Sequence, residues 1–238
     1  MLDLLLPRRC LVCGADGSQL CASCRAGLPR VEPPLCERCG APTAWPVQRC
    51  RECTGRRLGF ARARAAVAYD ASVQRLVAGW KERGLRRLAE DAADLVAERI
   101  PGLDADVVTF VPADSGRLAE RGHHPAARLA SALAGRMSLP FEPLLMRARR
   151  SQRQRGLSLA ERRRNVAGAF AATQQVGGTV LLVDDVYTSG ATVSAAASAL
   201  RAAGAPRVDV VTFARTIRLS QRPQEATWSF SSRARTSR

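Results

Sequence analysis

The chain has no long apolar run. None of its 238 residues belongs to a stretch approaching the roughly 18 consecutive apolar residues that a membrane-spanning helix needs. Near the N-terminus, Leu4, Leu5 and Leu6 stand between Asp3 and Pro7, too few for the apolar core of a secretory signal. We therefore expect a cytoplasmic protein without membrane insertion.

Lysine is almost absent as well. Lys81 is the only lysine among 37 basic residues, and it follows Trp80 rather than a glycine. A nucleoside-triphosphate loop needs a lysine after its second glycine, and a dinucleotide fold needs G-x-G-x-x-G, which the sequence also lacks. With 21 acidic residues, the formal net charge is +16. The arginines either bind polyanionic partners or reflect a biased composition with solvated faces; both interpretations stay open.

Cysteine is concentrated in residues 1–57, which we predict to be a double zinc-ribbon-like domain. All eight cysteines form C-x-x-C pairs. Two pairs can supply four thiolates to one tetrahedral Zn²⁺, so the spacing predicts two structural sites, with disulfides as the competing interpretation. Sequential pairing and an interleaved cross-brace both remain open. The expected ligands are Cys10, Cys13, Cys21, Cys24, Cys36, Cys39, Cys50 and Cys53.

A second motif follows a short apolar run at residues 180–183. The run is typical of a strand buried in a parallel sheet, and Asp184 and Asp185 follow it directly. Residues 188–192 then form a small polar turn around Gly190, before a predicted helix over residues 191–203. Backbone N–H groups there can surround an oxyanion. Carboxylates beside a phosphate-binding turn suit phosphoribosyl pyrophosphate (PRPP); the alternative is a buried strand followed by two solvated aspartates.

The remaining pattern predicts an α/β fold. Strands are expected at residues 60–69, 106–111 and 208–213, and helices at 72–84, 85–100 and 118–136. Trp80 is expected in the core, Lys81 is a weak candidate for a phosphate contact, and His123 and His124 are expected to form a surface pair. Residues 147–164 carry eight arginines against one acid, which favours a mobile anion-binding flap over a solvated face.

The turn at residues 183–192 resembles the PRPP loop of type I phosphoribosyltransferases. Together with the C-x-x-C pairs, residues 118–122 and residues 154–166, it makes residues 1–215 similar to the ComF/GntX family. The resemblance implies a type I phosphoribosyltransferase fold over 58–215, a parallel sheet flanked by helices with a flexible flap, followed by a basic, disordered tail at 216–238.

The same resemblance implies the roles of individual residues. Asp184 and Asp185 would be catalytic and contact the ribose hydroxyls, and Mg²⁺ would accompany PRPP. The 5′-phosphate would be held by Thr188, Ser189, Gly190, Ala191 and Thr192. Pyrophosphate would be held by Pro112, Ala113, Asp114, Ser115, Gly116 and Arg117, with Arg121 nearby.

The acceptor of the phosphoribosyl group stays open. Family members more often carry Phe-Asn in place of His123-His124, and a Thr-Pro-Pro-Gln flap in place of residues 151–154. Glutamine-dependent transfer is not expected, because Met1 is followed by Leu2 rather than a nucleophilic cysteine. Every cysteine also belongs to a C-x-x-C pair. The alternative to a transferase is a protein of DNA uptake, part of a competence machinery, that binds single-stranded DNA and keeps the PRPP fold as a sensor or scaffold.

Overall fold

The structure is a computed structural model that describes residues 8–85, 87–114, 116, 118, 122–148 and 168–217. Three residues predicted to contact pyrophosphate, Ser115, Arg117 and Arg121, lie outside this set. So does the predicted flap apart from residues 147–148, and so does nearly all of the predicted tail.

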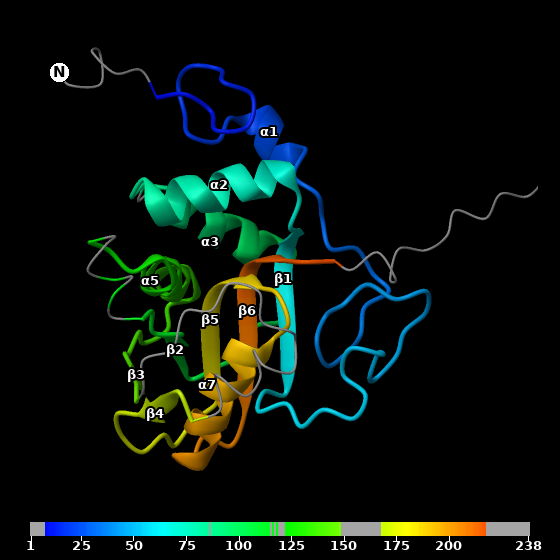
Figure 1. Ribbon diagram of the computed structural model, residues 1–238, viewed down its shortest axis with the longest axis vertical. Helices are drawn as coiled ribbons and strands as arrows, with labels where there is room; N and C mark the ends of the chain where they lie inside the picture. The colour runs from blue at the N-terminus through cyan, green and yellow to red at the C-terminus, as the bar shows by residue number, and fades with distance from the viewer. Residues whose placement is uncertain are drawn as a thin grey trace, which may run out of the picture.

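A parallel sheet forms the centre of the molecule (Figure 1). The strand β6 (Val208–Arg215) is buried along its whole length and lies between β1 (Arg62–Ala68) and β5 (Val180–Tyr187). Five of its eight residues are apolar, as expected of a strand covered on both faces. The expected parallel sheet flanked by helices is therefore confirmed. In spatial order its strands are β1 (Arg62–Ala68), β6 (Val208–Arg215), β5 (Val180–Tyr187) and β2 (Val107–Phe110).

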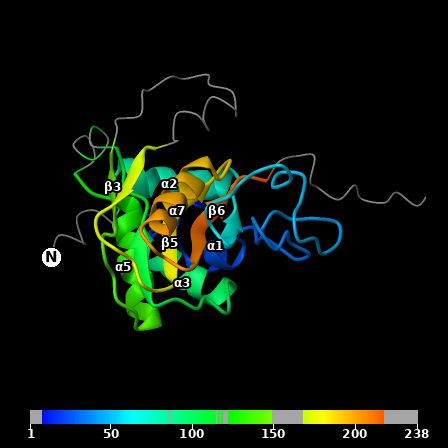
Figure 2. The same cartoon turned by 90° about the horizontal axis from the view of Figure 1, so that it is seen from below.

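Helices cover both faces of this sheet. Figure 2 shows α3 and α7 on opposite sides of it. The helices α2 (Ala71–Glu82), α3 (Leu88–Arg99) and α5 (Pro125–Met137) share one face. On the other face α7 (Ala191–Ala202) packs beside a small antiparallel pair, β3 (Leu145–Arg147) and β4 (Phe170–Ala172). A short helix, α1 (Ala22–Ala26), belongs to the cysteine-rich segment.

No helix in the described ranges is both long and apolar enough to cross a membrane.

Two differences from the predicted element boundaries bear on the site. The strand β5 does not end at Val183 but continues to Tyr187, because Asp184 and Tyr187 still pair with Thr212 and Arg215 of β6. The helix α5 begins at Pro125 rather than at residue 118. Proline is favoured in the first helical turn, where its missing N–H costs nothing.

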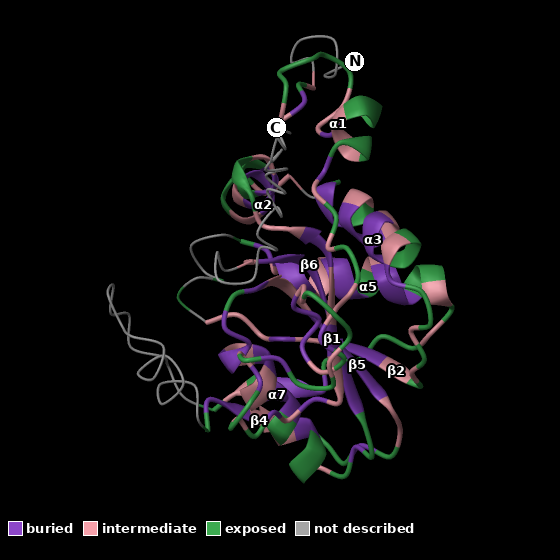
Figure 3. Cartoon of the chain, turned by 90° about the vertical axis from the view of Figure 1, so that its right-hand side faces the viewer, coloured by how far each residue is buried: buried purple, intermediate pink, exposed green. Residues whose placement is uncertain are grey.

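The buried apolar residues form two clusters, one on each face of the sheet (Figure 3). The cluster under α2, α3 and α5 contains Trp80, which packs edge-on against Phe213 at a ring distance of 6.3 Å, as expected for a core tryptophan. It also takes in Leu20 and Leu28 from the N-terminal segment. The cluster around α7 contains the last four cysteines of the chain. Both faces of the sheet are thus completed by the cysteine-rich segment.

Candidate functional site

The acidic pair lies in the last half of β5, beyond the end of β2, since Phe110 of β2 pairs with Val183. Both carboxylates are half-buried. Lys81 Nζ, in the last turn of α2, lies 2.7 Å from Asp185 Oδ1. Asp184 Oδ1 accepts a hydrogen bond from the Asp185 backbone N–H at 2.9 Å. The two side chains are therefore held in place by different groups.

The electrostatics of the pair favour a proton on Asp184. Burial, and then the negative charge of Asp185, raise the pKa of Asp184 to about 8, although Lys81 and Arg147 act in the opposite direction. A ligand that offers hydroxyl donors or a cation would stabilise the ionised form of Asp184. The site therefore favours a ligand that carries several hydroxyl groups or a bound cation.

A tight turn follows β5 and starts α7. Gly190 has φ 70°, and a Cβ there would collide with the Tyr187 ring, so only glycine fits. Gly190 has no side chain that could cap α7; Ser189 Oγ accepts from the Ala191 N–H at 3.4 Å, and no described residue accepts from the backbone N–H groups of Ser189 and Gly190. Because helix N-termini carry positive partial charge, this turn favours an anion.

The loop after β2 is fastened from two sides. The Ala113 N–H donates to His124 Nε2 at 2.7 Å, and Arg147 Nε donates to the Pro112 carbonyl at 3.1 Å. Asp114 Oδ1 accepts from the Gly116 N–H at 3.1 Å, whereas its Oδ2 is buried with no partner among the described residues. The loop predicted to hold pyrophosphate is therefore fixed next to the acidic pair and contains one unsatisfied carboxylate oxygen.

The histidine prediction was wrong. His123 is buried, at 8% exposure, and its Nε2 lies 2.9 Å from the Trp80 carbonyl. His124 is half-buried, and burial lowers its pKa. Its Nδ1 lies 3.3 Å from the Ala127 N–H and its Nε2 lies 2.7 Å from the Ala113 N–H. A neutral imidazole can accept one of these two hydrogen bonds, and an imidazolium can accept neither. His124 is a neutral cap that joins α5 to the loop.

Two basic residues of the site were undervalued in the sequence. Lys81 was a weak candidate, although its being the only lysine among arginines was a signal. Arg147 was assigned to the flap, but it lies in β3, with its guanidinium 5.0 Å from the centre of the Phe170 ring. The positive charges that border the carboxylates thus come from α2 and β3.

The cysteines gather in sequence order, so of the two open pairings the structure has the sequential one. The first cysteine cluster is Cys10, Cys13, Cys21 and Cys24, and the second cysteine cluster is Cys36, Cys39, Cys50 and Cys53. Within each, the sulfur atoms lie within 4.8 Å of one another.

The sulfur spacing fits zinc rather than disulfides. Sulfur separations of 3.6 Å for Cys39–Cys50 and 3.7 Å for Cys13–Cys21 match the roughly 3.8 Å edge of a tetrahedron with zinc–sulfur bonds of about 2.3 Å. A disulfide would need about 2.05 Å. All eight cysteines are free thiols. Each cluster can therefore hold one structural zinc ion.

The second cysteine cluster touches the site through Arg215. This arginine is only 1% exposed; its Nη1 donates to the Cys39 carbonyl at 2.5 Å and its Nη2 lies 3.4 Å from Glu52 Oε2. The guanidinium also lies 5.0 Å from the centre of the Tyr187 ring, the ring that excludes a side chain at Gly190. A continuous set of contacts thus runs from the cluster to the turn before α7.

Comparison with known families agrees with this geometry. Residues 1–54 match the double zinc ribbon domain, and residues 88–234 match the phosphoribosyl transferase domain. A solved glutamine PRPP amidotransferase from B. subtilis is 27% identical over 53% of this chain and 25% of that chain, with a TM-score of 0.36.

Curated relatives extend the similarity over most of the chain. The DNA utilization protein YhgH of Salmonella typhimurium is 31% identical over 208 residues, covering 83% of this chain and 91% of the relative. Competence protein F of Haemophilus influenzae is 26% identical over 227 residues, covering 87% and 96%. The chain therefore belongs to the phosphoribosyltransferase family, in the group with an N-terminal double zinc ribbon that includes the ComF and YhgH proteins, and the family expected from the sequence is confirmed.

Proposed function

We propose that the chain binds PRPP at the C-terminal ends of β5 and β2 and transfers or holds its phosphoribosyl group. The observation that carries the proposal is the acidic pair, with Asp185 held by Lys81 at 2.7 Å, next to the start of α7, where the Ser189 and Gly190 N–H groups have no acceptor among the described residues. Carboxylates accept hydrogen bonds from vicinal ribose hydroxyls, and backbone N–H groups at a helix start donate hydrogen bonds to a phosphate. The proposed 5′-phosphate contacts are residues 188–192.

Magnesium fits the same site. Mg²⁺ keeps most of its ligands from water and substrate phosphates and takes only one or two carboxylates from a protein. The unpartnered Oδ2 of Asp114 is the type of oxygen that could contact such an ion or its water. Bound Mg²⁺ would neutralise part of the charge of the pyrophosphate leaving group.

The chemistry assigned to the protein is positioning and electrostatic stabilisation. As the bond from ribose C1 to pyrophosphate breaks and a bond to an acceptor forms, the sugar gains positive charge. Asp184 and Asp185 would orient the hydroxyls and offset that charge, while residues 112–117 and Arg121 would hold the departing pyrophosphate. The acceptor must carry a nucleophilic atom; its identity is left open.

Calorimetry with Mg²⁺ and PRPP tests the proposal. We expect saturable binding to the zinc-loaded protein and at least about a tenfold loss of affinity when Asp184→Asn and Asp185→Asn are combined. The matched control is Asp104→Asn, since Asp104 is exposed and lies outside the site. Absent binding to the wild type, or equal affinity of the double variant and the control, would refute the PRPP site.

A second candidate function is DNA handling, which the names of two relatives favour: DNA utilization protein and competence protein. A net charge of +16 suits a polyanion, and phosphate neutralisation alone gives binding without sequence preference. Eight free thiols suit a reducing compartment, so a cytoplasmic location is part of the proposal.

One titration separates the two functions. Single-stranded DNA is titrated at several salt concentrations with and without PRPP, while pyrophosphate release is assayed with candidate amines and nucleobases. Salt-sensitive DNA binding without turnover would favour DNA handling. Turnover that disappears in the Asp184/Asp185 variant, with negligible DNA affinity at physiological salt, would favour the transferase.

A further inference from the structure

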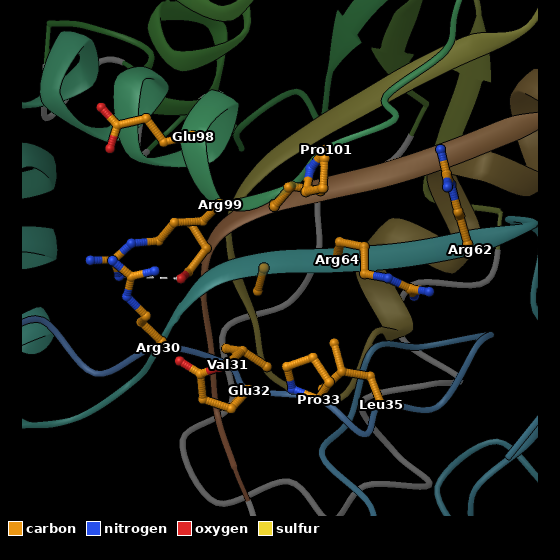
Figure 4. A pocket seen from close by; sticks show the side chains of 13 residues that line it. Arg30, Val31, Glu32, Pro33, Leu35, Arg62, Arg64, Glu98, Arg99 and Pro101 are labelled. Atoms are coloured by element: carbon orange, nitrogen blue, oxygen red, sulfur yellow. Dashed lines mark hydrogen bonds between the residues drawn. The ribbon is translucent and has the colours of Figure 1, made fainter. Parts of the chain in front are cut away.

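A cavity of about 440 Å³ opens between the outer edge of β1, the end of α3 and the segment that connects the two cysteine clusters (Figure 4). Backbone hydrogen bonds close it at both ends of the strand. The Ala68 N–H donates to the Pro29 carbonyl at 2.9 Å, and the Ala63 N–H donates to the Arg38 carbonyl at 2.8 Å. A polymer cannot run along β1 through this space, so its size and closure suit a small molecule.

The walls of the cavity are strongly basic. Four arginines and two glutamates line it. Arg62 pairs with Asp209, 2.7 Å away, a carboxylate that it shares with Arg207, and Glu98 pairs with Arg25, 2.6 Å away. Three cationic side chains, Arg30, Arg64 and Arg99, therefore remain against one acid, Glu32.

Arg64 and Arg99 have no carboxylate partner among the described residues. Arg64 Nη1 donates only to carbonyls, at 3.0 Å to Glu37 and 2.8 Å to Ala63. Arg99 likewise donates to the carbonyls of Leu28 and Arg25, at 3.5 and 3.3 Å. Carbonyls satisfy the donors but leave the charge uncompensated, and an anion would compensate it.

The arrangement in Figure 4 places charge at two ends and apolar surface between them. Arg30 and Arg99 lie close together at one end, and Arg62 and Arg64 lie at the other. Val31, Pro33 and Leu35 of the connecting segment form one side between them. Such a cavity suits an anion that also carries an apolar or cyclic body.

We propose that this cavity binds a small phosphorylated molecule of about nucleoside monophosphate size, at a site separate from the acidic pair. Guanidinium forks match phosphate oxygens in pairs, which favours a phosphate over a single carboxylate. The acidic pair is on β5, and β6 lies between β5 and β1, so the two sites are two strands apart, roughly 10 Å within the sheet. Both can be occupied at once.

Calorimetry with AMP, in the presence of saturating Mg²⁺ and PRPP, tests the proposal, with inorganic phosphate as a second probe. Tighter binding of AMP than of inorganic phosphate is expected, because the nucleoside contacts the apolar wall. Arg64→Gln should weaken AMP binding about tenfold. Arg30→Gln should weaken it severalfold without a risk to folding, because the exposed Arg30 side chain forms no hydrogen bond with described residues.

The matched control is Arg75→Gln, which removes one exposed charge from α2 outside the cavity. AMP affinity should be the same in this control, in the Asp184→Asn/Asp185→Asn variant and in the wild type. The proposal is overturned if wild-type protein binds neither probe. It is equally overturned if the Asp variant abolishes AMP binding while Arg64→Gln and Arg30→Gln leave it unchanged. If only PRPP binding fails, the AMP result can still be interpreted. The Asp184→Asn/Asp185→Asn variant measures AMP binding to this cavity without a bound PRPP.

Discussion

The two cysteine clusters have the same ligands but different surroundings. In the first, Cys13 is exposed and only Cys10 is buried. The segment that carries the first cysteine cluster contacts the core through Leu20 and Leu28, which pack with residues of α2 and α3. In the second, all four cysteines are buried and belong to the same apolar cluster as Phe60, Tyr187 and Val193.

This difference shows that sequence repetition does not imply equal roles. The second cysteine cluster is part of the core on which the α7 turn rests, whereas the first lies at the periphery of the opposite face. We predicted residues 1–57 as one domain, and that boundary stays a prediction. The shared core indicates that zinc loss from the second cluster would extend into the phosphoribosyltransferase fold. The following predictions test the contrast, from the largest effect to the smallest.

Loss of a thiolate should have unequal effects in the two clusters. Structural zinc contributes on the order of 10 kcal/mol to the folding of small domains. We expect Cys39→Ser to lose one of two zinc ions and to lower the free energy of unfolding of the whole chain by several kcal/mol. Cys13→Ser should also lose one zinc but leave the main urea transition near its wild-type midpoint. Equal shifts of that transition would contradict the contrast.

Arg215 should matter more than an exposed arginine because it links the second cluster to the site. Arg215→Met removes the cation that lies 3.4 Å from the Glu52 carboxylate in the wild type. Removing one partner of a buried ion pair costs about 3–5 kcal/mol. Urea unfolding should show that loss, and Mg²⁺-PRPP affinity should fall with it. The exposed Arg75→Met is the control; similar unfolding midpoints for both variants would break the proposed link.

The pH dependence should separate the acidic pair from the zinc clusters. The pKa of Asp184 is raised from 3.8 to about 8, so the folded state binds a proton that the unfolded state has released. Its contribution to stability is therefore fully present below pH 4 and is lost as pH rises through 8.

Measurements between pH 6.5 and 9 avoid acid release of zinc. There the wild type should lose stability with rising pH relative to Asp184→Asn. Affinity for Mg²⁺-PRPP should rise over the same range, because the ligand needs the ionised carboxylate. Identical pH profiles of the wild type and the Asn variant, in both measurements, would count against the raised pKa.

His124 should give the smallest effect. His124→Ala removes the cap of α5 and the acceptor for the Ala113 N–H, which together should lower the free energy of unfolding by about 1 kcal/mol. PRPP affinity should fall a few fold through the loosened loop. His124→Asn restores a cap at the helix start and should recover most of the stability but not the loop contact. Full recovery of affinity in the Asn variant would exclude a positioning role.

The sequence predicted the strands, the metal clusters and the turn, which depend on local patterns of residues. The alternation of small apolar residues with arginine predicted β1, and apolar runs predicted β5 and β6. The C-x-x-C pairs predicted the metal clusters, and the residues after Val183 predicted the turn and α7. It did not predict that Asp184 stays within the strand, because that follows from pairing with Thr212 of β6.

Other parts of the site depend on contacts between segments far apart in the chain. Lys81 meets Asp185 across 104 positions, and Arg215 meets Cys39 across 176. The buried His123 side chain contacts the carbonyl of Trp80 in α2, more than 40 positions away. No local pattern specifies such pairings, so only the three-dimensional arrangement reveals them.

Hydrogen exchange with and without Mg²⁺-PRPP tests the central claim most directly. We predict slower exchange at residues 184–192 and 112–114, and unchanged exchange at residues 10–24 in the first cysteine cluster and 62–66 beside the arginine cavity. Protection confined to the cysteine segments or to the cavity, with residues 184–192 unchanged, would contradict PRPP binding between β5 and α7.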